Sequence, residues 1–310
     1  MEKLASSSVP LSEEVRYPRF MNVRQVADYL QLNEKKIYAL VNESNIPATK
    51  VTGKWLFPRE LIDRWLLESS HGGVLTDRMA LAGGDDPLLQ RVLARLMDKV
   101  QAQANVSFSG TGVKLGLSLL ARQRAEICTL HWGPAEESQM RHTALLNQYP
   151  QHRDWLLVRA FRREQGLMVR PEHAGRLEDL LQADLRWVQR QDGSGTQRFL
   201  QETLARHKRG LVALQERTVA VAHSQRDAAS QVAMRLADVA PGTRGCATEF
   251  GLAFVPVGWE CFDFALYRGV YFRKLFHQLL QILESEDSRA LAERLGGYDL
   301  SEVGRVVWTA

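Results

Sequence analysis

Cysteine is scarce in this sequence, and the three present, Cys128, Cys246 and Cys261, are far apart and odd in number. Their spacing fits neither a zinc motif nor a disulfide framework, so we expect three reduced thiols with structural roles. Long hydrophobic runs are also missing. No stretch reaches the roughly eighteen apolar residues that a membrane-spanning helix needs. We therefore expect a protein without a membrane span, in the reducing environment of the cytoplasm.

A secretory signal is missing as well. Residues 1–18 carry Ser and Glu without an apolar signal region, and we expect a flexible leader there. The chain has 310 residues, of which 45% are hydrophobic, and this is enough for two or more globular domains. Its net charge is only +4, so any strongly basic surface must be a local concentration of charge.

Residues 19–68 have the pattern of a winged helix-turn-helix. Asn22 can cap a first helix, and Asn33 can cap a second one after a tight turn. A hairpin pattern then runs from Thr49 to Phe57, turning at Thr52-Gly53, and a third helix is expected from Pro58 to about Leu67. This order of elements is typical of duplex-DNA readers, in which the second helix enters the major groove.

Positive charge is concentrated in this segment. Between Asn33 and Arg59 there are five Lys or Arg against two Glu, a local excess of +3. Such an excess suits phosphate neutralisation, although a solvated surface is the alternative. Trp55, Phe57 and Trp65 are expected to be core residues. The candidate DNA-binding residues lie on the second helix, on the hairpin and just after it: Asn33, Lys35, Lys36, Tyr38, Lys50, Lys54 and Arg59.

The segments Phe20–Leu30, Lys36–Val41 and Gly53–Leu66 together resemble the excisionase/MerR-type helix-turn-helix family over about fifty residues. The resemblance implies double-stranded DNA as a partner, with the helix at Asn33–Ser44 in the major groove and the hairpin as the wing. A homodimer is expected, because one short recognition helix reads few base pairs.

A small-residue linker at 69–75 separates this module from an α/β pattern over residues 76–310. Strands are expected at Leu75–Ala82, Val106–Ser109 and Ile127–Trp132, with helices between them, which favours parallel strands joined by crossover helices. An internal echo supports two similar lobes. Ser109-Gly-Thr111 and Ser194-Gly-Thr196 each stand between a strand and a helix, and residues 121–128 resemble residues 233–240.

Three small-residue loops at helix starts, Gly83–Asp86, Ser109–Gly112 and Gly193–Thr196, can hold an anion with backbone N–H groups. In the first loop, Asp85 and Asp86 instead suit a ligand with hydrogen-bond donors, such as a pterin or the edge of a nucleobase. Alternatives remain open: Ser194 and Thr196 can merely cap a helix, His131 can be a structural histidine, and Arg190 can pair with a carboxylate. The candidate ligand residues are Gly84, Asp85, Asp86, Ser109, Gly110, Thr111, His131, Trp132, Gln191, Gly193, Ser194, Gly195, Thr196 and His223.

The second half, through the segments Phe161–Val169, Trp187–Leu200 and Gly296–Leu300, resembles the periplasmic-binding-protein-like domain that is also appended to molybdopterin-biosynthesis proteins. The resemblance implies lobe 1 at about 76–158 and 258–310, and lobe 2 at about 165–252. Two crossing segments, about Leu156–Val169 and Leu252–Gly258, join them; Arg162 and Arg163 in the first are expected to be surface charges. Where that family has Ser-His-Asp-Pro, this chain has Gly84-Asp-Asp-Pro87.

The sequence favours a one-component transcriptional regulator over an enzyme. Ser194 lacks the glycine at position 192 that a nucleophile elbow requires, and the Gly193–Gly195 loop lacks the lysine of a phosphate-binding P-loop. By association with its resemblance, the effector is molybdate, tungstate or a molybdenum-cofactor-like pterin, with no covalent cofactor and no metal site. An architectural, excisionase-like DNA-binding protein and a molybdenum-cofactor-metabolism protein are the alternatives.

Overall fold

The computed structural model describes residues 17–43, 46–69, 78–208 and 214–310. Most of the expected leader and linker therefore lies outside the described residues. The chain divides into two units, Met1–Thr76 and Asp77–Ala310. No described helix combines the length and the apolar character that crossing a membrane demands.

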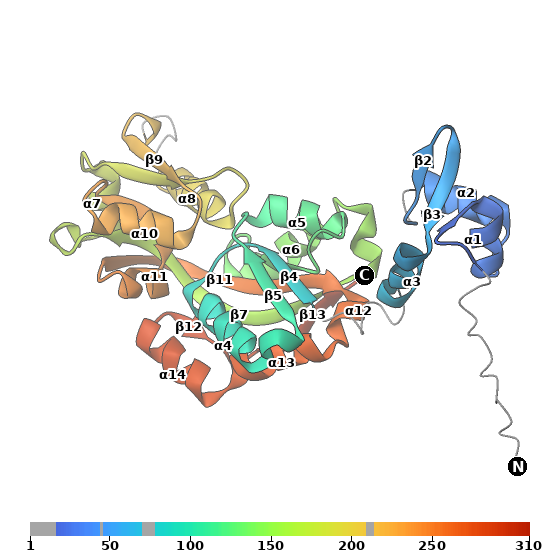
Figure 1. The fold of residues 1–310 in the computed structure, drawn as a ribbon. Coiled ribbons are helices and arrows are strands. Elements are labelled where there is room, and N and C mark those ends of the chain that lie inside the picture. The colour runs from blue at the N-terminus through green and yellow to red at the C-terminus, as the bar shows by residue number, and fades with distance from the viewer. Residues whose placement is uncertain (1–16, 44–45, 70–77, 209–213) are drawn as a thin grey trace, which may run out of the picture. The chain divides into compact units, whose positions relative to one another are not determined.

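The first unit contains three helices and a small sheet in its described part (Figure 1). A glutamine completes a capping box with Asn22 at the first helix, and the Asn33 side chain accepts the Lys36 N–H at the second, as expected. The third helix begins at Arg59, because Pro58 is still part of a strand. The elements are β1 (Phe20–Met21), α1 (Val23–Tyr29), α2 (Glu34–Asn42), β2 (Thr49–Val51), β3 (Lys54–Pro58) and α3 (Arg59–Ser69).

The hairpin gains a third strand that the sequence pattern did not indicate. β1 pairs antiparallel with β3, so that Met21 lies opposite Phe57, and the sheet order is β1-β3-β2. Both of these side chains are fully buried. Trp55 and Trp65 pack against the same core from partly buried positions, as expected for packing residues. At the hairpin turn, Thr52 and Gly53 both have positive φ, the geometry of a two-residue turn that matches strand twist.

The second unit is built on one mixed sheet, ten-stranded within the described residues, whose main path runs β5-β4-β6-β11-β7-β10-β8-β9. The strands are β4 (Arg78–Gly83), β5 (Asn105–Ser109), β6 (Ile127–Leu130), β7 (Trp155–Val169), β8 (Trp187–Arg190), β9 (Thr218–Ala222), β10 (Val239–Thr243), β11 (Ala253–Tyr267), β12 (Tyr298–Asp299) and β13 (Val306–Thr309).

Parallel pairing occurs at both ends of this sheet, as the sequence predicts. β4 is parallel to β5 and β6, and β8 is parallel to β9 and β10. One part of the internal echo has the same backbone geometry in both lobes. Gln123 and Arg235 stand at equivalent turns with positive φ, and the amides that follow both bond back to the preceding helix.

The two crossing segments lie in two long strands, β7 and β11. β7 and β11 pair antiparallel from Ala253–Val169 to Tyr267–Trp155, with register shifts near Pro256 and Phe262. The second segment thus continues well past Gly258 into lobe 1, since its pairing with β7 satisfies the backbone along its whole length. β12 and β13 also pair with β7.

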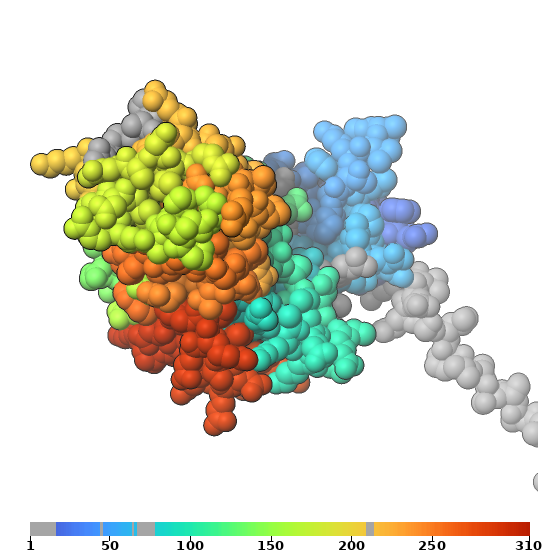
Figure 2. Space-filling view, turned by 90° about the vertical axis from the view of Figure 1, so that its left-hand side faces the viewer, coloured from blue at the N-terminus to red at the C-terminus, as the bar shows by residue number. Residues whose placement is uncertain are grey.

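Helices cover both faces of each end of the sheet, so each lobe has two apolar layers. In Figure 1, α4 and α13 lie on one side of the lobe 1 sheet, with α5 and α6 on the other. The helices are α4 (Pro87–Val100), α5 (Val113–Ala121), α6 (Ser138–Leu146), α7 (Leu177–Gln182), α8 (Gly195–Arg206), α10 (Gln225–Ala233), α11 (Arg244–Glu249), α12 (Arg268–Tyr271), α13 (Lys274–Glu284) and α14 (Glu286–Leu295). In Figure 2 the yellow and orange surface of lobe 2 lies directly against the red and blue-green surface of lobe 1.

Candidate functional site

The outer face of α2 presents polar side chains to solvent. Ile37 and Val41 are buried in the core of the first unit, which turns Lys35, Lys36 and Tyr38 outward. Asn33 is exposed too, although its side-chain oxygen is engaged in capping the helix at 2.8 Å from the Lys36 amide nitrogen. The face therefore carries two cations and an amphipathic ring at the start of the helix, the part of a recognition helix that meets base edges.

The hairpin presents two further cations. Lys50 and Lys54 are both exposed, and the Lys50 ammonium lies 5.5 Å from the centroid of the Trp55 ring. Arg59 is less free to meet a phosphate, because its Nη1 donates to the carbonyl oxygen of Tyr17 at 3.1 Å. Of the seven expected DNA-binding residues, the four lysines on α2 and on the hairpin are thus exposed cations.

In the second unit, the Asp86 carboxylate has all of its hydrogen-bond partners within the fold of the chain. One carboxylate oxygen caps α4 by accepting the Leu88 and Leu89 amides at 2.8 and 3.0 Å. The other accepts Arg163 Nη1 at 2.9 Å and the Tyr298 hydroxyl at 3.0 Å. The expectation that Asp86 would meet ligand donors is therefore wrong for this structure, because four donors of the chain already surround its carboxylate.

The Asp85 carboxylate also has partners within the chain, and these contacts connect the two lobes. Its Oδ1 accepts Arg190 Nη2 at 3.2 Å, and its Oδ2 accepts the backbone N–H of Gln225 at 2.5 Å. Its own carbonyl oxygen accepts Arg163 Nη1 at 2.9 Å. Asp85 follows β4 in lobe 1, whereas Arg190 and Gln225 belong to lobe 2. The alternative that Arg190 pairs with a carboxylate is confirmed.

The two Ser-Gly-Thr loops lie side by side. The Lys114 amide at the start of α5 donates to the carbonyl oxygen of Gly193 at 3.1 Å, so a group of lobe 2 fills the helix start of lobe 1. A Cβ added to Gly112 would lie 3.4 Å from the Ser194 Cα. Ser109 and Gly110 remain exposed, and Thr111 partly so. The second helix start expected to hold an anion is thus occupied from within the chain.

The third loop is a buried helix cap. Ser194 Oγ accepts the Gln197 amide at 3.0 Å, and Thr196 Oγ1 accepts Gln225 Nε2 at 2.9 Å. A Cβ on Gly195 would come within 2.2 Å of the His131 carbonyl oxygen, so only glycine permits this approach of lobe 2 to lobe 1. The capping alternative therefore holds for Ser194 in this structure.

Gln191 and His223 lie at the edge of this contact. Gln191 Nε2 donates to the His223 carbonyl oxygen at 3.0 Å, and the His223 side chain is exposed. Trp132 is partly buried, and its backbone N–H donates to His142 at 3.0 Å. Its ring lies 5.9 Å from the Lys114 ammonium. These residues and the exposed Ser109 and Gly110 lie at the edge of the contact between the lobes. Their geometry does not assign them a role in ligand binding.

His131 is a structural histidine in this structure. It is buried, stacks on Phe262, and its Nδ1 lies 3.0 Å from Glu260. Burial lowers the pKa of His131, and Arg163 acts in the same direction against the opposing effect of Glu260. The ring is therefore neutral at pH 7, and its Nδ1–H donates to the carboxylate.

Sequence reasoning missed Glu260 and was wrong about Arg163, which is fully buried rather than a surface charge. Arg163 Nε donates to Glu260 at 2.7 Å, and its guanidinium lies 4.5 Å from the Phe262 centroid. Burial opposes ionisation of Glu260, yet His131 and Arg163 lower its pKa to about 2. The partners of Arg163 lie far away in the sequence, so no local pattern indicated its burial.

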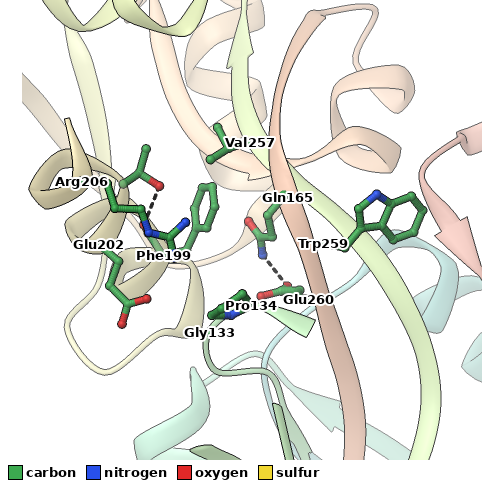
Figure 3. Close-up of a pocket in the computed structure, with 11 residues that line it drawn as sticks. Gly133, Pro134, Gln165, Phe199, Glu202, Arg206, Val257, Trp259 and Glu260 are labelled. Atoms are coloured by element: carbon green, nitrogen blue, oxygen red, sulfur yellow. Dashed lines mark hydrogen bonds between the residues drawn. The ribbon is translucent and has the colours of Figure 1, made fainter. Parts of the chain in front are cut away.

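A pocket lies where α8, β11 and the loop after β6 meet, with about 330 Å³ of empty space, part of it open to solvent. In Figure 3, Phe199, Glu202 and Arg206 of α8 stand opposite Val257 of β11, while Trp259 points away from α8. Gln165 Nε2 donates to Glu260, and because a carboxylate accepts only, the amide oxygen must face the other way. That oxygen is buried and has no hydrogen-bond partner among the described residues.

Two further ion pairs connect lobe 1 with lobe 2. Arg91 of α4 meets Glu249 of α11 at 2.9 Å, and Arg141 of α6 meets Glu202 of α8 at 2.6 Å. The described residues contain no cluster of metal-binding side chains. The two lobes are thus closed on each other, and the contacts between them are polar and charged. Such groups can exchange partners more readily than the side chains of an apolar core.

Known proteins match both units. Residues 94–284 match the PBP superfamily domain, and residues 20–70 match a helix-turn-helix domain. The uncharacterized protein YvgK of Bacillus subtilis (strain 168) is 22% identical over 307 residues, covering 92% of this chain and 96% of that protein. This similarity extends across both units.

Among solved structures, an H2O2-bound cysteine-to-serine mutant of OxyR from Corynebacterium glutamicum matches with a TM-score of 0.52 and 13% identity, covering 92% of this chain and 94% of that one. A putative phosphate ABC transporter substrate-binding protein from Clostridium perfringens, with bound phosphate, matches with a TM-score of 0.50 and 11% identity, covering 72% and 100%. At these identities the likeness shows the fold alone, the two-lobed α/β fold of the second unit.

Proposed function

The chain belongs to the PBP superfamily and carries a helix-turn-helix domain ahead of that domain, and on this premise we propose that it is a one-component transcriptional regulator. It binds operator DNA through the first unit and a small effector between the lobes of the second. One observation carries the proposal: a single chain joins an exposed basic recognition helix to two lobes that meet through charged groups.

The DNA half rests on the exposed lysines of α2 and the hairpin. Lys35 and Lys36 suit phosphates or base edges of the major groove, and Lys50 and Lys54 suit flanking phosphates. A homodimer in the cytoplasm, bound to a two-fold operator, gives a recognition helix of this length enough base contacts.

The effector half rests on the continuity of β7 and β11 through both lobes. Two antiparallel strands can bend as a hinge, and a ligand biases the lobe arrangement by its differential affinity for the open and closed forms. We propose molybdate, tungstate or a molybdenum-cofactor-like pterin as the effector. The free amide oxygen of Gln165 supports the pterin, because ring N–H groups can donate to it.

The DNA half is tested by selecting bound sequences from a random duplex pool with the full chain. Lys36→Ala combined with Lys54→Ala should weaken binding to the selected site by at least about tenfold, because the variant neutralises fewer phosphates and so releases fewer counterions. Lys99→Ala, on the exposed face of α4, is the matched control and should bind like the wild type. Equal binding by the double variant would refute the assignment of the DNA-reading surface.

The effector half is tested by thermal unfolding of the full chain with each candidate ligand. A ligand at one hundred times its dissociation constant adds about 2.7 kcal/mol and raises the midpoint of unfolding. A specific rise, together with a change in operator affinity, supports a sensor. Operator binding that no ligand alters would favour an architectural role instead, and ligand binding without any operator would favour a protein of molybdenum-cofactor metabolism.

A further inference from the structure

Arg190 is a buried cation with few anionic neighbours. Its side chain is only 3% exposed, although it lies at the end of β8, where lobe 2 meets lobe 1. Within the described residues its one carboxylate partner is Asp85; its other hydrogen bonds go to neutral oxygens of Gln191, Ala222 and His223. A buried guanidinium without an anion is strongly unfavourable, so this place requires a negative charge.

Part of this guanidinium is still unused. Arg190 Nη1 is buried and has no hydrogen-bond partner in the described part of the chain. Asp85 of lobe 1 accepts from this guanidinium through a single oxygen. The bidentate pairing that arginine can form with a carboxylate is therefore incomplete. The geometry is thus that of an anion site filled by a carboxylate that fits it only in part.

The start of α10 supplies the second half of this site. α10 spans Gln225–Ala233, with Ser224 capping the Asp227 amide, and the N–H of Gln225 donates to Asp85 Oδ2 from 2.5 Å. The positive end of the helix dipole and a first-turn amide without a partner inside the helix together favour an anion here. Both donors belong to lobe 2, whereas the anion that they hold belongs to lobe 1.

We propose that Asp85 is an internal counter-ligand, which occupies an anion-binding site made by Arg190 and the first turn of α10. The effector carries a carboxylate or a tetrahedral oxyanion that takes the place of the Asp85 side chain. This inference rests on the effector half of the proposed function and is independent of the DNA half. Effector binding is then an exchange of one anion for another, and the closed arrangement with Asp85 in place is the effector-free state.

The exchange has a measurable consequence. The apparent dissociation constant for a free anion is the intrinsic one divided by the fraction of molecules in which the site is empty. An intramolecular competitor lowers this fraction and so weakens the apparent affinity. Removing the Asp85 carboxylate should therefore create a site for simple anions. In the full-length Asp85→Ala variant, acetate, phosphate, sulfate or molybdate should raise the unfolding midpoint saturably, with an apparent dissociation constant at least about tenfold below that of the wild type.

The titrations are made at constant ionic strength against sodium chloride, so that general salt effects cancel. A response to acetate alone assigns the site to carboxylates, and a response to phosphate, sulfate or molybdate assigns it to tetrahedral oxyanions. Asp98→Asn, on the exposed face of α4, is the matched control and should behave like the wild type. Asp85→Ala combined with Arg190→Met should lose the anion response.

If Asp85→Ala does not fold, Asp85→Asn serves in its place, because the amide oxygen can still accept the Gln225 N–H, whereas the charge and the second acceptor that faced Arg190 are lost. The proposal is overturned if Asp85 variants and wild type respond to every anion alike, or if the response survives the loss of Arg190. Neither result depends on DNA, so a failure here leaves the lysine test of the DNA half untouched.

Discussion

The Nδ1 of His131 lies 3.0 Å from a carboxylate oxygen of Glu260, which follows it by 129 positions in the sequence. Both side chains are almost completely buried, and Arg163 holds the opposite oxygen of the carboxylate. The histidine directly follows β6 in lobe 1, and the glutamate lies on β11, the strand that runs through both lobes. This buried pair makes the stability of the folded chain sensitive to acid.

The free energy of unfolding should fall as the pH drops below about 6.5, the unperturbed pKa of histidine. Burial lowers the pKa of His131 in the folded chain, so below that pH the unfolded chain binds a proton that the folded chain refuses. Glu260 adds a second loss between about pH 4.5 and pH 2, because its folded pKa is about 2. Urea unfolding from pH 8 to pH 4 measures the first effect.

His131→Gln is the test variant, since glutamine can still donate to Glu260 but does not titrate. Its stability should change less with pH than that of the wild type between about pH 6.5 and 5, by at most about 1.4 kcal/mol per pH unit. Comparing the two proteins cancels the titration of the other histidines. Parallel pH profiles would show that His131 is not the titrating group.

Replacing the buried Arg163 should be costly. Its guanidinium is held by Asp86 and Glu260, and Arg163→Met would leave both carboxylates buried without their cation. We expect a loss of about 3–5 kcal/mol in the free energy of unfolding. Arg162→Met is the matched control on the same strand, because Arg162 is partly exposed and 3.8 Å from Glu302; a loss below about 1 kcal/mol is expected there. Similar losses in both variants would contradict the paired role of Arg163.

The local features of the fold could be predicted from the sequence. Asn22 and Asn33 cap helices as expected, since a cap depends on residues only three positions apart. Thr52-Gly53 forms the expected turn for the same reason. The parallel strands followed from alternation of strand and helix patterns, and the helix-turn-helix and two-lobed fold classes followed from motif resemblance.

The contacts of the site could not be predicted in this way. Arg163 has the same sequence context as Arg162, and only its partners, 77 and 97 positions away, make it a buried cation. The loops at Asp85 and Gly193 were correctly placed at helix starts, but Gly193 also accepts from the start of α5 and Asp85 from the start of α10, each in the opposite lobe. Which lobe meets which is a property of the tertiary fold, and a periodicity argument does not contain it.

The approach of the lobes should depend on Gly195. A Cβ there would lie 2.2 Å from the His131 carbonyl oxygen and 2.5 Å from its ring, and neither buried group can move aside. Gly195→Ala should therefore separate the lobes, at a cost of about 1–3 kcal/mol in stability. Small-angle scattering should show a larger radius of gyration. Gly258→Ala, where a Cβ meets nothing within 4 Å, should leave both quantities unchanged, and an equally compact Gly195→Ala would refute the close approach.

Lys50 and Lys54 should differ in their contribution to DNA binding, although both are exposed on the hairpin. Lys50 lies over the Trp55 ring, which holds its ammonium near the sheet, whereas no ring contact restrains Lys54 in the described structure. The plot of log affinity against log salt concentration should become shallower by about 0.9 for each phosphate that the protein no longer neutralises. We expect this full change for Lys54→Ala and a smaller one for Lys50→Ala. Fluorescence anisotropy of an operator duplex between about 50 and 200 mM salt spans the range in which such slopes are resolved. Unchanged slopes in both variants would show that the hairpin does not contact the backbone, and would leave α2 as the DNA-reading element of this unit.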